Sequence, residues 1–271
     1  MRYKKQCAEA RIILEMLDFK KYKRFFAFGC SMTSYYWPTW ADIIAQEIPE
    51  SYNYGQAGGG NLFIASQVAE ANTRFKFNKD DLVIVMWSSI SREDRYRHGA
   101  WITPGNIYTQ NYFDEKFVQE WADSRGYLVR DLAVITMCKG LLDSVNTNYH
   151  MLCMAPFVDI QFNDPKKAFD DGVDVLNFYS DTVESLAPDL LTVACNGTWP
   201  QHPIRHKAGS QTADYHPSTE MYYRYLNEIF RGTQFSPTTV EFVKKFETII
   251  KQSQYLEDFK YHWSKELPPR L

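Results

Sequence analysis

The chain has 271 residues, of which 45% are hydrophobic and 23% are charged, so it is long enough for one α/β domain with a substantial core. Its 30 Lys and Arg residues nearly balance its 33 Asp and Glu residues, which leaves no positive field to hold a phosphate backbone. We therefore expect no nucleic-acid partner. The five Cys residues are odd in number and widely spaced, which is typical of reduced core residues rather than of a disulfide framework or a zinc site.

The first residues of the chain carry charges within an apolar stretch. Glu9, Arg11 and Glu15 interrupt the hydrophobic residues, so this stretch is neither the core of a signal peptide nor a membrane span. We therefore expect a cytoplasmic protein that is not secreted by a signal peptide of its own and that has no membrane partner. The helical spacing of the apolar residues predicts an opening helix at 8–17.

Short apolar runs alternate along the chain with segments of helical periodicity. The predicted strands span residues 25–28, 51–54, 81–87, 149–154 and 190–194. The predicted helices between them span residues 38–46, 61–74, 114–144, with a break near Gly126, and 166–186. This alternation predicts an α/β fold with a doubly wound parallel five-stranded sheet flanked by helices, which binds ligands beyond the carboxyl ends of its strands.

The last part of the chain is predicted to be helical. Periodic segments predict helices at 218–230, 238–252 and 254–265. We predict an α/β domain at 1–235 and a helical C-terminal extension at 236–271 that packs on it.

Residues 92–111 carry no clean period and predict a long loop or lid, because loops of this length are usually functional or mobile. Aromatic residues gather in and beside this segment. They fit a wall on which sugar rings stack, although loop packing accounts for most such aromatics.

Ser31 lies in the segment Gly29-Cys30-Ser31-Met32-Thr33, directly after the first predicted strand. A Ser at the carboxyl end of a buried strand is exposed to substrate, and nearby backbone N–H groups can stabilise an oxyanion. The alternative is a Ser that only caps the next helix, and this segment alone does not separate the two. Cys30 should point the other way, into the core, which disfavours it as a nucleophile.

A second candidate segment, Asp214-Tyr215-His216-Pro217, precedes a predicted helix. Two residues apart in an extended loop, Asp214 and His216 project to the same side, so the carboxylate can orient the imidazole and stabilise its charged form. His216 can then accept the proton of Ser31. The alternative is a loop His beside a Pro that begins a helix.

Together, residues 28–33 and 214–217 resemble the first and last sequence blocks of the SGNH (GDSL-like) hydrolase family. The resemblance implies the flavodoxin-like SGNH hydrolase fold, with Ser31 as nucleophile and with His216 and Asp214 as its acid–base partners. The chain is also similar to divergent SGNH-like proteins encoded by bacterial viruses, some of them attached to particles. This similarity implies virion proteins as assembly partners and carriage on a virus particle as an alternative location.

Members of the family bind the oxyanion with the N–H of the nucleophile, a Gly after the second strand and an Asn after the third. Residues 53–58 resemble the second block, which implies Gly58 as a donor. At 87–92, where the family shows Gly-x-Asn-Asp, this chain has Trp-Ser-Ser-Ile-Ser-Arg, so the expected Asn is absent. The candidates to replace it are Asn61, Ser88, Ser89 and Arg92.

Two other interpretations of these segments are disfavoured. The Gly cluster at 58–60 precedes a helix, but no Lys-Ser/Thr follows it as in a phosphate-binding loop. His202 and His206 would share a helix face and could bind a metal with Asp214, but Pro203 argues against a helix there. We expect neither a metal nor a cofactor.

These residues predict a serine ester hydrolase that acts on a small-molecule or glycan ester, and the family resemblance adds a carbohydrate O-deacetylase as the substrate-level hypothesis. The alternative is a non-catalytic SGNH-fold structural or binding protein, such as a component of a virus particle. Loss of one oxyanion donor costs about a hundred- to a thousand-fold in rate, so the missing Asn bears directly on this choice.

Overall fold

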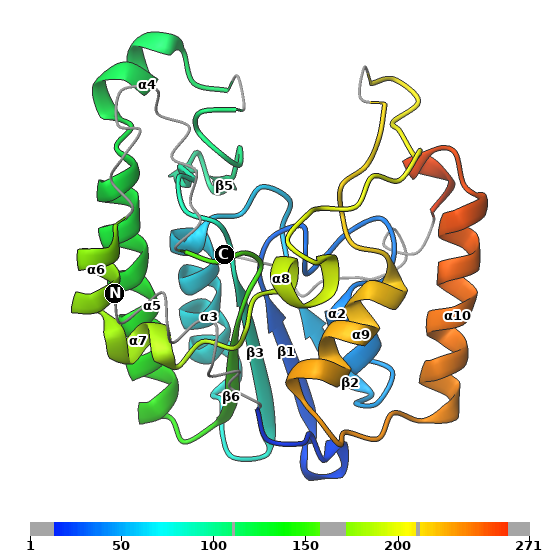
Figure 1. Cartoon of the computed structure of the whole chain (residues 1–271). Coiled ribbons are helices and arrows are strands. Elements are labelled where there is room, and N and C mark those ends of the chain that lie inside the picture. The colour runs from blue at the N-terminus through cyan, green and yellow to red at the C-terminus, as the bar shows by residue number, and fades with distance from the viewer. Residues whose placement is uncertain (1–13, 110–111, 158–171, 210–211, 260–271) are drawn as a thin grey trace.

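The computed structural model describes residues 14–109, 112–157, 172–209 and 212–259. Its centre is a parallel sheet with the strand order β2-β1-β3-β6, and helices cover both faces of the sheet (Figure 1). The strands are β1 (Arg24–Phe28), β2 (Glu50–Asn53), β3 (Asp81–Trp87) and β6 (Asn148–Cys153). The predicted α/β class and the parallel sheet flanked by helices are confirmed.

The predicted fifth strand at 190–194 is wrong, because these residues form helix α8 (Leu190–Cys195). The Asp189 side chain caps this helix by accepting a hydrogen bond from the N–H of Thr192 at 2.8 Å. A short apolar run is compatible with a buried helix as well as with a strand, and periodicity does not separate the two over so few residues. The sheet therefore has four strands rather than five.

Two helical layers enclose the sheet. The helices over one face are α3 (Asn61–Phe75), α5 (Ser124–Ser144), α6 (Val173–Phe178) and α7 (Ser180–Glu184). The helices over the other face are α2 (Trp40–Ile44), α8, α9 (Thr219–Ile229) and α10 (Pro237–Gln252). Phe26 and Phe28 of β1 belong to the first core, whereas Phe25 and Ala27 belong to the second. The strand is thus buried on both faces, as its continuous apolar run predicts.

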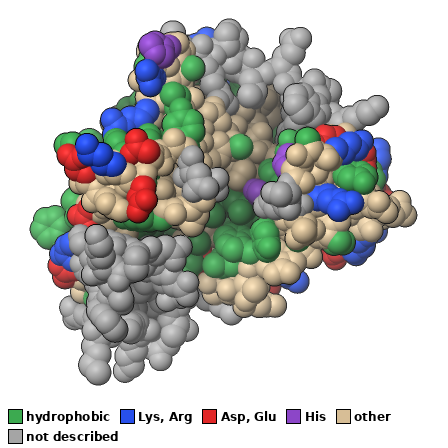
Figure 2. All heavy atoms as spheres, turned by 90° about the horizontal axis from the view of Figure 1, so that it is seen from above, with side chains coloured by type: hydrophobic (Ala, Val, Ile, Leu, Met, Phe, Trp, Pro, Cys, Tyr) green, Lys and Arg blue, Asp and Glu red, His purple; other side chains and the backbone are tan. Residues whose placement is uncertain are grey.

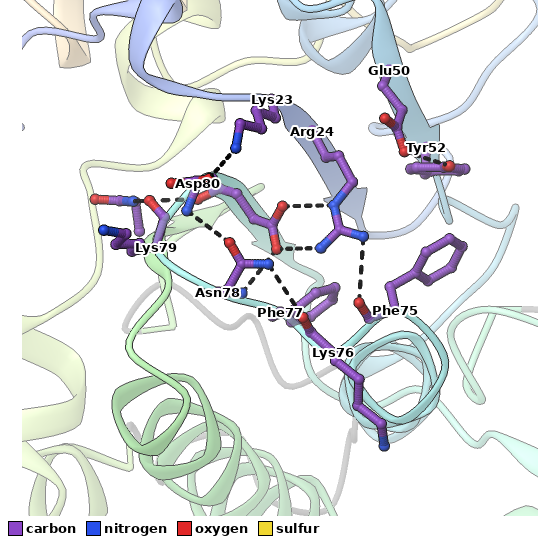
Figure 3. Close-up of polar contacts among 12 residues, drawn as sticks. Lys23, Arg24, Glu50, Tyr52, Phe75, Lys76, Phe77, Asn78, Lys79 and Asp80 are labelled. Atoms are coloured by element: carbon purple, nitrogen blue, oxygen red, sulfur yellow. Dashed lines mark hydrogen bonds and ion pairs between the residues drawn. The ribbon is translucent and has the colours of Figure 1, made fainter.

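An ion pair joins β1 to β3 at the amino ends of the strands. The guanidinium of Arg24 donates to both carboxylate oxygens of Asp81 at 2.7 Å and to the carbonyl of Phe75 at 3.3 Å (Figure 3). The Asp81 side chain is only 1% exposed. Lys23 and Asp80 form a second pair nearby, at 2.6 Å, with the Lys23 side chain 76% exposed. The buried pair fixes the register of the two central strands at the edge opposite Ser31.

The predicted opening helix at 8–17 lies partly outside the described residues, and its described part, 14–17, is not helical. The N–H of Leu14 donates to the carbonyl of Ile229 at 2.9 Å, so this segment runs beside the end of α9. A short 3-10 helix, η1 (Phe19–Lys21), then leads into β1.

The C-terminal segment contains α10 and a 3-10 helix, η2 (Leu256–Asp258). The predicted helix at 254–265 is therefore wrong for residues 254–259, and its remainder lies outside the described residues. Glu47 ties α10 to the sheet domain, since it accepts hydrogen bonds from the N–H of Ser236 at 2.7 Å and from the hydroxyl of Thr239 at 2.5 Å. The division of the chain at residue 235 stays a prediction.

The segment predicted as a long loop contains a β-hairpin of β4 (Arg95–Arg97) and β5 (Ala100–Ile102). Both turn residues have positive φ, 54° at His98 and 79° at Gly99, as in the tight turns that match strand twist. The residues after Gly99 therefore pair with those before His98 instead of forming an open lid.

The helical segment predicted at 114–144, with a break near Gly126, forms α4 (Glu115–Trp121) and α5, and the break comes at residues 122–123. The Asp123 side chain accepts from the N–H of Arg125 and begins α5. The helix predicted at 166–186 lies outside the described residues up to residue 171, and its described part is split into α6 and α7.

Candidate active site

Ser31 lies three residues beyond β1, at the edge where the carboxyl ends of the parallel strands meet. A tight turn presents it, because the N–H groups of Thr33 and Ser34 both donate to the carbonyl of Cys30, at 2.9 and 3.2 Å. Ser31 is partly exposed, whereas Cys30 is fully buried against Met154, as the sequence predicts. Viewed over this edge, the molecule is hollowed near its centre, where hydrophobic side chains and histidine gather (Figure 2).

The structure brings Ser31, His216 and Asp214 together. His216 Nε2 lies 2.9 Å from Ser31 Oγ, and His216 Nδ1 lies 3.1 Å from Asp214 Oδ1. The Asp214 Oδ1 atom also accepts the backbone N–H of His216 at 2.8 Å. The two ring nitrogens of one imidazole thus link a hydroxyl to a carboxylate, although 185 positions separate the serine from the histidine.

Tyr35 holds the other side of the carboxylate. Its hydroxyl donates to Asp214 Oδ2, and its ring stacks on the His216 imidazole with centroids 3.6 Å apart and planes 18° from parallel. Burial alone would raise the pKa of Asp214, but the hydrogen bonds and charge of His216, with the hydroxyl of Tyr35, outweigh it and hold the pKa below its ordinary value. Asp214 is therefore a buried, ionised carboxylate at neutral pH.

Hydrogen bonds on both sides of His216 fix the loop before α9, and those on the α9 side join it to the segment that follows Ser31. Trp37 Nε1 donates to the carbonyl of Pro217 at 2.8 Å, and the hydroxyl of Thr219 donates to the carbonyl of Pro38 at 2.9 Å. On the other side, the backbones of His202 and Asp214 exchange two hydrogen bonds at 2.8 and 2.9 Å. These contacts hold the base in register with Ser31.

Gly58 lies in the loop between β2 and α3, and its geometry excludes a side chain. Its φ is +74°, and a Cβ at this position would lie 2.1 Å from the carbonyl oxygen of Thr103. Within the described part of the chain, neither the N–H of Gly58 nor that of Ser31 donates a hydrogen bond.

Asn61 and Ser88, two of the candidate replacements for the missing Asn, bond to each other. The Asn61 side chain accepts from the N–H of Ser88 at 2.8 Å and donates to the Ser88 carbonyl at 3.2 Å and to Asp131 Oδ2 at 2.9 Å. Both residues are buried, with exposures of 0% and 1%. The Asn61 amide and the Ser88 backbone thus join the start of α3 to the end of β3, and the Ser88 hydroxyl donates to Met154 Sδ at 3.6 Å.

Arg92, in the segment after β3, contacts the loop that contains glycines 58–60, here called the Gly-rich loop. Its guanidinium donates to the carbonyl of Gly59 at 3.0 Å and to Ser89 Oγ at 3.3 Å, and it lies 3.9 Å from Met154 Sδ. Met154 in turn contacts Cys30, the neighbour of Ser31, at 3.8 Å. Arg92 therefore contacts the Gly-rich loop directly, with Ser89 as one of its supports, and reaches the nucleophile turn only through Met154 and the buried Cys30 side chain.

A buried network behind the Gly-rich loop was not predicted from the sequence. Asp94 accepts from the N–H of Gly60 at 2.9 Å and of Phe63 at 3.0 Å, so its carboxylate caps α3. Burial raises the pKa of Asp94 despite these bonds. Arg130 joins this network, since it donates to the carbonyl of Arg92 at 2.8 Å. Acidic residues 34 positions away from the helix that they cap leave no local signal in the sequence.

An open cavity of about 480 Å³ lies against this network, and Ser31, Asp214 and His216 are not among its lining residues. Its lining residues are Leu62, Glu93, Asp94, Arg95, Trp121, Asp123, Gly126, Tyr127 and Arg130. Within the described ranges, no three His, Cys, Asp or Glu side chains gather as metal ligands. None of the helices in that part of the chain is long and apolar enough to span a membrane.

No protein-family model matches the chain, and no curated protein matches it. Solved structures that resemble it include a lipolytic protein of the G-D-S-L family from Veillonella parvula, with 13% identity over 77% of this chain and 98% of that one, at a TM-score of 0.42. A GDSL-like lipase from Bacteroides thetaiotaomicron has 12% identity over 90% and 96%, at 0.41. A catalytic mutant of the acetylxylan esterase Axe2 from Geobacillus stearothermophilus has 13% identity over 82% and 98%, at 0.44. Similarity at this level does not assign a family or a substrate to the chain.

Proposed function

We propose that the chain is a serine ester hydrolase with Ser31 as nucleophile, His216 as general base and acid, and Asp214 as the group that orients the imidazole. The observation that carries the proposal is the 2.9 Å separation of His216 Nε2 and Ser31 Oγ, with Nδ1 of the same ring held by a buried carboxylate. A hydroxyl is a weak nucleophile until an adjacent base removes its proton, and this arrangement supplies that base.

In the proposed reaction, His216 accepts the Ser31 proton as Oγ attacks the ester carbonyl carbon. The resulting tetrahedral oxyanion collapses, the alcohol leaves with the proton from His216, and an acyl group remains on Oγ. His216 then deprotonates a water molecule that attacks the acyl carbon, which releases the carboxylic acid and restores the Ser31 hydroxyl. The ionised Asp214 stabilises the imidazolium in both steps.

The backbone N–H groups of Ser31 and Gly58 are the proposed oxyanion donors, because neither donates within the described chain. Arg92 is the proposed third contributor in place of the missing Asn, since its guanidinium lies against the carbonyl of Gly59 and is partly exposed. A fixed positive charge beside the loop favours the developing negative charge of the oxyanion.

We also propose that the chain is a divergent SGNH hydrolase, on the basis of its two sequence blocks and of the contact between them. The proposed substrate is a small-molecule or glycan ester, with an O-acetylated carbohydrate as the specific candidate. Exposed aromatic side chains on the hairpin and α4 side of this edge fit sugar rings, because aromatic faces pack against the apolar faces of sugars. These side chains are Tyr96, Tyr112 and Trp121, with exposures of 54%, 57% and 66%.

Hydrolysis of p-nitrophenyl acetate by the Ser31→Ala variant tests the proposal. We expect turnover to fall to background while circular dichroism and the melting temperature match the wild type, because a partly exposed hydroxyl contributes little to the core. Ser66→Ala is the matched control, since Ser66 Oγ donates only to the carbonyl of Leu62 within α3. Unchanged turnover in Ser31→Ala would refute the assignment.

One observation favours the alternative, a non-catalytic SGNH-fold binding or structural protein such as a component of a virus particle. Two of the four candidate replacement donors, Asn61 and Ser88, are buried and bonded to each other. A fluorophosphonate probe separates the two functions, because labelling of Ser31 requires an activated hydroxyl. Labelling that disappears in Ser31→Ala supports the enzyme, and absence of labelling in the wild type supports the scaffold.

A further inference from the structure

Asp214 and His216 are separated by one residue in the sequence. Because only one residue separates them, a single carboxylate oxygen, Oδ1, accepts both the ring Nδ1–H and the backbone N–H of His216. The other oxygen, Oδ2, takes no part in either of these bonds. Asp214 is only 4% exposed, so an unpaired Oδ2 would be a buried charge without a donor.

Tyr35 supplies the donor and also contacts the ring. Its hydroxyl donates to Asp214 Oδ2, and its aromatic face lies 3.6 Å, centroid to centroid, from the His216 imidazole. One side chain therefore contacts both members of the pair, through its polar end and its apolar face. Tyr35 comes from the nucleophile segment, four residues after Ser31, so this contact ties the base to the same segment that carries the nucleophile.

The ring of Tyr35 is itself fixed. It packs edge-to-face against Trp37 with centroids 4.8 Å apart, and Trp37 is fully buried and donates to the carbonyl of Pro217. The imidazole thus stacks on a ring that is itself packed, with its Nε2 2.9 Å from Ser31 Oγ. A protonated imidazole also gains from lying against the electron-rich face of a tyrosine.

We propose that Tyr35 is a positioning residue, which sets the orientation of the Asp214–His216 pair toward Ser31 and stabilises the carboxylate that the pair requires. Its role in turnover rests on the proposed hydrolase function, whereas its hold on Asp214 and His216 does not. The segment after the nucleophile thus carries both the attacking hydroxyl and the clamp on its base.

The first test measures the ionisation of Asp214 in the full chain, by carbon-13 NMR of its carboxyl group across pH. Tyr35→Phe keeps the stacked ring and removes the hydroxyl, so we expect the Asp214 pKa to rise by roughly half a unit to one unit, because a carboxylate that loses a donor becomes easier to protonate. The other titratable groups that face this pair are Tyr36, His202 and Tyr222, with Glu247 facing His202. All four remain in the variant.

Tyr36→Phe is the matched control. Tyr36 is the next residue and interacts with the Asp214 charge, but the structure describes no hydrogen bond between the two. We expect the Asp214 pKa in this variant to match the wild type. An Asp214 pKa that is unchanged in Tyr35→Phe, or that moves equally in both variants, overturns the proposal. This readout needs no catalysis, so it decides the point even if the wild-type chain hydrolyses no ester.

The second test uses turnover of p-nitrophenyl acetate. We expect the acidic limb of the kcat/KM profile to move to higher pH in Tyr35→Phe and not in Tyr36→Phe. In Tyr35→Ala, which also loses the stacked ring, we expect kcat to fall about 100-fold with KM nearly unchanged, because Tyr35 orients the base and does not touch substrate. A wild-type rate in a folded Tyr35→Ala variant contradicts the proposal.

Discussion

Asp131, behind the Gly-rich loop, should make the free energy of unfolding depend on pH. The sign of this dependence is opposite to that of most carboxylates, whose pKa is lowered by folding. Its side chain is fully buried, accepts from Asn61 Nδ2 at 2.9 Å and pairs with Arg130 at 2.7 Å. Burial raises its pKa from 3.8 to about 6, although Arg130 and Asn61 act in the other direction. In the folded chain Asp131 therefore keeps a proton that the unfolded chain releases near pH 4.

The difference of about two pKa units corresponds to about 3 kcal/mol, because each unit is worth about 1.4 kcal/mol. This stability is fully present below pH 4 and is lost as pH rises through 6. We expect the Asp131→Asn variant, which does not titrate, to lack this loss. Its free energy of unfolding relative to the wild type should rise by about 3 kcal/mol between pH 4 and pH 8.

Urea unfolding followed by circular dichroism at five or six pH values measures this difference directly. Asp143→Asn is the control, because Asp143 lies on the same helix but is half exposed and pairs with Lys139 at 2.7 Å. Its curve should run parallel to the wild type above pH 5. A constant offset between Asp131→Asn and the wild type across the range would refute the reasoning, since it would show that Asp131 ionises alike in both states.

Three further predictions concern Arg24, Gly58 and His150. Arg24→Met should lower the free energy of unfolding by about 3–5 kcal/mol, because it leaves the buried Asp81 carboxylate without its partner. Lys23→Met removes an exposed pair and should change the free energy of unfolding far less; denaturant unfolding measures both. Gly58→Ala should lower kcat/KM for p-nitrophenyl acetate about 100-fold or more, because the new methyl group would displace Thr103 and the Gly58 N–H. Gly99→Ala is the control: Gly99 has a similar φ and open space around it, so kcat/KM should not change. Burial lowers the pKa of His150 to about 4, so its contribution to stability is present above pH 6.5 and lost as pH falls through 4, and His150→Leu should flatten that part of the stability curve.

The central strands were predictable because their patterns admit few alternatives. All seven residues of β3 are buried. A continuous apolar run of this length is typical of a strand covered on both faces and is too short for a typical core helix. The 190–194 segment has the same apolar character, but Asp189 starts a helix there. The apolar composition of the segment therefore does not distinguish a helix from a strand, whereas the capping side chain just before it favours the helix.

The pairing of Ser31 with His216 was predictable from two rules. Parallel strands bring their carboxyl ends to one edge, and residues two apart in an extended loop face the same side. The part played by Tyr35 was not predictable in this way. Its contact with Asp214 joins residues 179 positions apart, and a tyrosine four residues after a serine carries no signal of that contact.

The oxyanion donors show where prediction from residue type ends. Asn61 and Ser88 have the right chemistry and lie at the right strand and helix ends, yet a donor can serve a ligand only if no closer acceptor takes it. Asp131, 70 positions after Asn61, accepts a hydrogen bond from the Asn61 amide. The Ser88 backbone bonds to the same amide through both its N–H and its carbonyl. Whether a polar group can bind a ligand thus depends on all of its surroundings. For that reason the proposed oxyanion donors are two backbone N–H groups and Arg92. The Arg92 guanidinium has five N–H donors, more than the acceptors that it contacts.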